Sequence, residues 1–62
     1  MKENELKAKA LIIGMKLKTL NWSDWSGTKA HNWCIEQAQG MNIISNNDLN
    51  YIAYTAMNFV IS

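Results

Sequence analysis

The chain has 62 residues, of which 48% are hydrophobic and 18% charged, and its formal net charge is +1. This length gives one domain, residues 1–62, whose core is only marginally sufficient, and the hydrophobic content excludes a disordered tail. The single cysteine excludes an internal disulfide, and no apolar run resembles a signal peptide or reaches the length of a membrane span, so we expect a cytoplasmic protein.

The pattern of apolar residues predicts a first helix over about residues 4–20. Its apolar stripe recurs in steps of three and four: Leu6, Ala10, Ile13, Leu17 and Leu20. More apolar residues lie beside this stripe: Ala8, Leu11, Ile12 and Met15. That surface is wider than one partner helix requires, which indicates a binding partner or a dimer. Gly14 marks either a close backbone approach or neutral drift.

The lysines of the first helix fall on two lines. Lys2, Lys9 and Lys16 are seven apart, and Lys7 and Lys18 lie on a second line. The interpretation we favour is a solvated face, because Glu3 and Glu5 dilute the positive charge and the chain has no arginine. The alternative is an electrostatic footprint for an anionic partner.

A tryptophan-rich turn follows the first helix. Trp22, Trp25 and Trp33 are close enough in sequence to converge on one side and seal a small core. Asn21–Gly27 is rich in side chains that hydrogen-bond to the nearby backbone, which predicts a turn or a single helical turn. We favour a core role for the tryptophans over a binding role.

The second helix is predicted over residues 28–39, with Gly40 as its left-handed C-terminal cap. Its centre line is Ala30, Cys34, Ala38 and Met41. His31 and Cys34 share a face and are candidates for a metal or catalytic pair, but no other histidine or cysteine completes a zinc site. We therefore interpret Cys34 as a small buried hydrophobe and expect no metal, no cofactor and no enzymatic activity.

The third helix is predicted over residues 47–61, after a partly buried linker, Met41–Ile44. Ser45 and Asp48 have capping-box spacing, with Asn46 and Asn47 as rival caps. Its inward stripe is Leu49, Ile52, Ala53, Ala56, Phe59 and Val60. A second apolar line, Tyr54, Met57 and Ile61, runs beside it. The helix is too short to span a bilayer and has no basic residue for a membrane surface.

The distribution of charge argues against a helix-turn-helix protein. Residues 1–30 carry six lysines and three acids, net +3, whereas residues 31–62 carry only Glu36 and Asp48, net −2 with His31 neutral. The candidate recognition helix thus lacks basic residues that could neutralise DNA phosphates, the interaction that supplies most non-specific DNA affinity. Glu36 also occupies the position where the turn requires a small residue.

These patterns predict an all-α, compact three-helix domain that acts as a non-enzymatic protein–protein interaction module. It would regulate or inhibit a larger protein, and its composition is similar in style to the small accessory proteins of bacteria, phages and mobile elements. The expected anchors are Trp22, Trp25, Tyr51, Tyr54, Met57 and Ile61. We also expect a homodimer through the third helix and one flank of the first. The alternative is a dimeric DNA-binding regulator whose phosphate contacts come from Lys2, Lys9 and Lys16.

Overall fold

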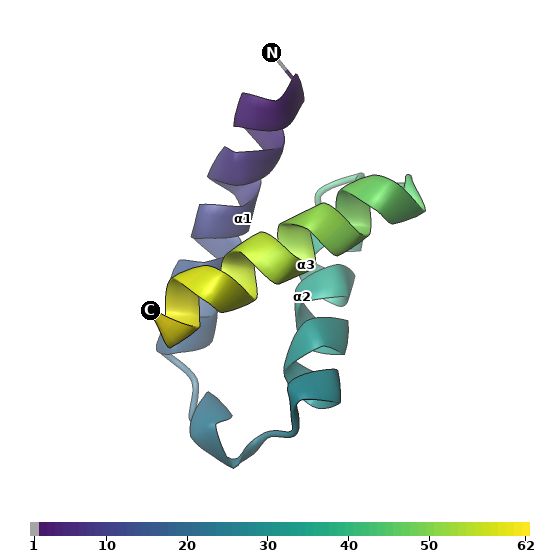
Figure 1. Cartoon of the computed structure of the whole chain (residues 1–62). Helices are drawn as coiled ribbons and strands as arrows, with labels where there is room; N and C mark the ends of the chain where they lie inside the picture. The colour runs from purple at the N-terminus through teal and green to yellow at the C-terminus, as the bar shows by residue number, and fades with distance from the viewer. Residues whose placement is uncertain (1) are drawn as a thin grey trace.

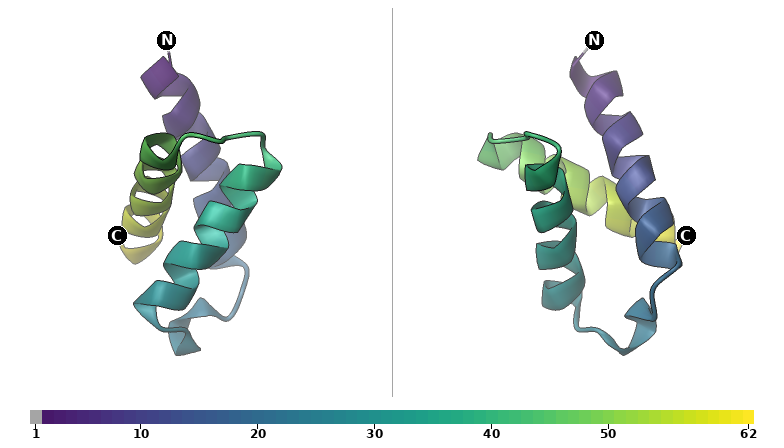
Figure 2. Two further views of the ribbon diagram at one scale, coloured as in Figure 1. Left: turned by 90° about the vertical axis from the view of Figure 1, so that its right-hand side faces the viewer. Right: turned by 180° about the vertical axis from the view of Figure 1, so that it is seen from behind.

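Three α-helices and one short 3-10 helix make up the fold. The computed structural model describes residues 2–62, with α1 over Lys2–Lys18, η1 over Trp22–Asp24, α2 over Gly27–Gly40 and α3 over Asn46–Ile61. The helix α3 lies across one face of the α1–α2 pair and packs against both, whereas α1 and α2 contact each other less (Figures 1 and 2). The predicted all-α, three-helix fold is confirmed, and every predicted helix boundary lies within two residues of the observed one.

The core is aliphatic and lies where α3 crosses the other two helices. Its members are Leu6, Ala10, Ile13, Leu17, Cys34, Ala38, Leu49, Ile52, Ala53, Ala56 and Val60. The predicted inward stripes are thus largely confirmed, although Leu20 lies beyond the end of α1 and is exposed, and Phe59 is half-buried. The three tryptophans are also half-buried and pack against this cluster from outside it.

Gly14 allows α1 and α3 to cross closely. It is buried, and a Cβ added there would lie 2.8 Å from Cδ2 of Phe59 and 3.2 Å from the carbonyl oxygen of Ala56. Of the two interpretations offered by the sequence, the structure supports close backbone approach. The small residues Ala53 and Ala56 on α3 are fully buried, which is typical of a tight helix crossing.

The ends of α2 combine one side-chain cap with one left-handed residue. Oγ of Ser26 accepts a hydrogen bond from the backbone N–H of Lys29 at 3.1 Å, which satisfies a donor of the first turn. The prediction that Gly40 caps the C-terminus is wrong, because Gly40 is still helical and Asn42, at φ 68°, takes the left-handed conformation. The N–H groups of Asn42 and Ile43 close the Schellman pattern on Gln39 and Ala38.

The start of α3 differs from the predicted capping box. Ser45 occupies the cap position, but its side chain makes no capping hydrogen bond. The Asp48 carboxylate instead lies 3.1 Å from Nζ of Lys2, which links the first turns of α1 and α3. The Asp48 side chain thus forms a tertiary ion pair with Lys2 in place of the capping role that the local motif predicts. Within residues 2–62, every helix falls short of the length and apolarity needed to cross a membrane.

Candidate protein-binding groove

An apolar groove lies where the tryptophan-rich turn meets the C-terminal half of α3. It encloses about 170 Å³, and we call it the Trp–Met groove. Its lining residues are Leu17, Trp22, Trp25, Ser26, Gly27, Ala30, Met57, Val60 and Ile61. These come from α1, η1, α2 and α3, so the groove depends on how all four elements are placed.

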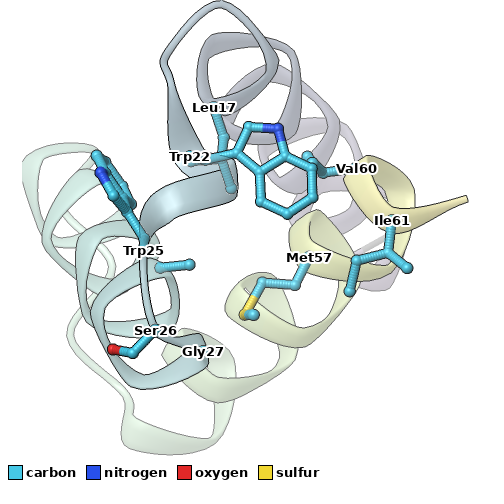
Figure 3. A pocket seen from close by; sticks show the side chains of 9 residues that line it. Leu17, Trp22, Trp25, Ser26, Gly27, Met57, Val60 and Ile61 are labelled. Carbon is cyan, nitrogen blue, oxygen red and sulfur yellow. The ribbon is translucent and has the colours of Figure 1, made fainter.

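Local hydrogen bonds hold the turn that forms one wall of the groove. The backbone N–H of Trp25 donates to the carbonyl oxygen of Trp22 at 2.8 Å and closes the single turn of η1. The capping bond of Ser26 then starts α2 directly after this turn. As a result Trp22 and Met57 lie on opposite sides of the opening (Figure 3).

A second, shallower hollow of about 370 Å³ continues the surface along α3. It shares Gly27, Met57 and Ile61 with the Trp–Met groove and adds the rings of His31 and Tyr54. The centroids of these two rings are 5.2 Å apart, so α2 and α3 are bridged by an aromatic contact beside the opening. Together the two hollows form one largely apolar surface in which Tyr54 is 64% exposed and Ile61 is 67% exposed.

The side chains of this surface are mainly apolar and aromatic. Trp25 lies 6.2 Å from Trp33, ring centroid to ring centroid, and Nζ of Lys29 lies 4.7 Å from the centroid of the Trp25 ring. The hydroxyl of Ser26 is already engaged as the cap of α2. Within residues 2–62, no buried side-chain nitrogen or oxygen lacks a hydrogen-bond partner.

The structure brings together most of the predicted anchor residues. Trp22, Trp25, Met57 and Ile61 line the Trp–Met groove, and Tyr54 joins them in the adjacent hollow. Tyr51 does not belong to this surface, because it lies near the other end of α3 in a hollow with Lys2 and Asp48. Further lining residues were not predicted from the sequence: Leu17, Ala30, His31 and Val60. Their role depends on helix crossing, for which the sequence carries no local signal.

The predicted basic residues differ in their contacts and in their exposure to solvent. Lys2 pairs with Asp48, and Nζ of Lys18 lies 4.6 Å from the centroid of the Phe59 ring. Lys9 is half-buried and Lys16 is exposed. Half of the six lysines, namely Lys2, Lys18 and Lys29, therefore already contact acidic or aromatic groups of the chain.

Cys34 and His31 differ in how deeply their side chains are buried. Cys34 is fully buried, and burial raises the pKa of its thiol from 9.0 to about 11, which disfavours the reactive thiolate. His31 is half-buried against Tyr54. Within the described part of the chain, no group of three or more histidine, cysteine, aspartate or glutamate side chains is placed to hold a metal ion.

Comparison with known proteins adds no relative to this picture. The chain matches no protein-family model, no curated protein and no solved structure. The function is therefore inferred from the residues of this chain alone.

Proposed function

We propose that this chain is a non-enzymatic protein–protein interaction module that regulates or inhibits a larger protein. The observation that carries the proposal is the convergence of Trp22, Met57 and Ile61 on one apolar groove, with Tyr54 exposed beside it. Aromatic and methionine side chains dominate binding energy where they are desolvated by a partner. An apolar side chain of the partner would fill the groove, and Tyr54 would be covered at its edge.

Several features of the groove suit a protein partner. It is a groove that opens to solvent, and most of its lining is apolar. Its rim carries an exposed charged residue, Lys29, which stays in water while the centre is desolvated. An apolar centre with a polar rim is the usual arrangement of a protein interface.

The test is capture of the partner by the tagged chain from its native host, with bound proteins quantified by mass spectrometry. Tyr54→Ala with Met57→Ala should reduce recovery of a specific partner by about tenfold or more, since each lost anchor costs about 1–2 kcal/mol. Ile44→Ala is the matched control, because Ile44 is 91% exposed and lines neither hollow. Equal capture by the wild-type chain and the double variant would refute the proposed role of the groove.

The DNA-binding alternative makes the opposite prediction with respect to salt. Phosphate contacts make log affinity fall by about one unit per contact for each unit of log salt, whereas an apolar groove weakens only slightly. Lys9→Glu with Lys16→Glu should leave capture through the groove intact. Tight duplex binding that is steeply salt-dependent, and that this lysine double variant abolishes, would favour the alternative.

A further inference from the structure

The helix α1 has a second apolar surface, on the side opposite the core. Ala8, Ile12 and Met15 follow one another in steps of four and three, so they lie along one line of the helix. The side chains of Ile12 and Met15 are 49% and 61% exposed. We call these three residues the outer face of α1. None of them lines the Trp–Met groove or the hollow beside it.

This outer face points away from the rest of the fold. Ile13 and Leu17 are buried on the opposite side of α1, and Gly14 approaches α3. At about 100° per residue, Ile12 and Met15 both project roughly 150° away from the middle of that buried side. The packing of α1 against α3 therefore leaves the outer face uncovered.

Lysines border this face in the register of a coiled coil. With Ile12 and Met15 as positions a and d of a heptad, Ala8 is the preceding d, and Lys9 and Lys16 fall on e positions. Lys18 falls on a g position on the other border, where Leu11 is the preceding g residue. Within residues 2–62 the one ion pair joins Lys2 to Asp48, so Lys9 and Lys16 make no ion pair with a carboxylate there, although Glu5, at the preceding a position, lies one helical turn before Lys9.

We infer that the outer face of α1 docks an amphipathic helix of a partner protein whose flanking positions carry glutamate or aspartate. Charge complementarity selects this occupant, because residues at e and g positions pair across a helix interface and determine which partner is accepted. An antiparallel second copy is disfavoured, since its Lys9 and Lys16 would face the same lysines, and a parallel copy would place Leu11 instead of an acid opposite Lys16. The contact spans about 10 Å of helix between Ala8 and Met15, which corresponds to a short and therefore weak interface.

A membrane surface is the less favoured occupant. Binding to a bilayer scales with buried apolar area, and the outer face offers only two large apolar side chains, Ile12 and Met15. It carries no tryptophan or phenylalanine, the residues that anchor helices at the headgroup level. The heptad spacing of Ile12 and Met15, with Lys9 and Lys16 beside them, instead fits a partner helix.

The probe for this inference is a synthetic three-heptad peptide with leucine at a and d and glutamate at e and g. Its control has the same sequence with lysine at e and g. Fluorescence anisotropy of the labelled peptides should show that the glutamate peptide binds the wild-type chain at least about tenfold more tightly than the lysine peptide, and less tightly as salt rises. Lys9→Glu with Lys16→Glu should invert this preference.

Further variants separate the outer face from the groove. Ile12→Ser with Met15→Ser changes only exposed side chains, so the fold should persist by circular dichroism while peptide binding is lost. Tyr54→Ala with Met57→Ala should leave peptide binding unchanged. The inference is overturned if the glutamate peptide does not bind, if both peptides bind equally, or if binding survives loss of Ile12 and Met15. Binding to vesicles of anionic phosphatidylglycerol in place of the peptide would also overturn it and assign the face to membranes.

Discussion

At the scale of single residues, burial decides what Cys34 can do. Its side chain is fully buried among aliphatic neighbours, and desolvation of the thiolate raises the thiol pKa to about 11. A thiol in this state is a poor nucleophile at neutral pH. The expectation from sequence that Cys34 acts as a small hydrophobe thus agrees with its place in the core.

We predict a measurable effect of Cys34 on stability at alkaline pH. Below pH 9 the thiol is protonated in both the folded and unfolded chains, so its contribution to stability is fully present. Between pH 9 and about 11 the unfolded thiol ionises while the folded one keeps its proton, and the free energy of unfolding should fall by roughly 2–3 kcal/mol from this group.

Urea unfolding of the wild type and of Cys34→Ala over this pH range checks the prediction. The variant should be less stable near pH 7 by about 1 kcal/mol, because a small cavity replaces the sulfur. Subtracting the two curves removes the titration of lysine and tyrosine side chains. A difference in unfolding free energy that stays constant from pH 9 to pH 11 would contradict the assigned burial of the thiol.

At the scale of elements, the crossing of α1 over α3 depends on a residue with no side chain. A Cβ added at Gly14 would lie 2.8 Å from Cδ2 of Phe59 and 3.2 Å from the carbonyl oxygen of Ala56. Two opposing effects act on an alanine there. Helix propensity favours alanine by about 1 kcal/mol, whereas overpacking of a tight contact costs about 1–3 kcal/mol.

Gly14→Ala should therefore destabilise the fold, by up to about 2 kcal/mol after the propensity gain is subtracted. The steric term prevails because one of the two contacts is with backbone, which cannot rotate away. Gly40→Ala is the matched control: Gly40 is also helical, and nothing lies within 4 Å of the added Cβ. Thermal unfolding should show a lower Tm for Gly14→Ala and an equal or higher Tm for the control. A rise in Tm for Gly14→Ala would show that the helices separate easily.

At the scale of the whole molecule, four of the six large apolar side chains that are exposed within residues 2–62 fall on two separate surfaces. Tyr54 and Ile61 are exposed on α3 beside the Trp–Met groove, whereas Ile12 and Met15 are exposed on α1, away from α3. A single two-fold interface through the third helix and a flank of the first would have to cover both surfaces. We therefore expect a homodimer to use the α3 surface alone, so that a second copy and the larger partner protein would compete for Tyr54 and Ile61.

Sedimentation at micromolar concentration should therefore show a dimer of the wild-type chain. Tyr54→Ala with Ile61→Ala should yield a folded monomer, because it removes the two large apolar side chains of α3 that are exposed. Ile12→Ser with Met15→Ser should remain dimeric, since the lysines beside that face disfavour a second copy. A wild-type chain that is monomeric and folded at every concentration would contradict the homodimer and leave the α3 surface to the larger partner protein alone.

The sequence by itself determined the helices and most of their inward faces. Apolar spacing and capping act over a few residues, so the stripe through Leu6 and Leu17 and the start of α2 after Ser26 can be read locally. The same local rules failed at Asn42 and Asp48. The left-handed residue that ends a helix can lie one or two positions beyond a glycine. A lysine that is distant in sequence can form an ion pair with a side chain that would otherwise cap the helix.

Only the tertiary structure decided where the candidate site lies. Trp22 and Met57 are far apart in the chain and face each other because α3 crosses the α1–α2 pair at a point set by Gly14. The same crossing separates Tyr51 from Tyr54, although the two residues are nearly adjacent on one helix. Apolar periodicity states which side of a helix is buried, but the angle and contact point of two helices depend on the summed packing of many side chains.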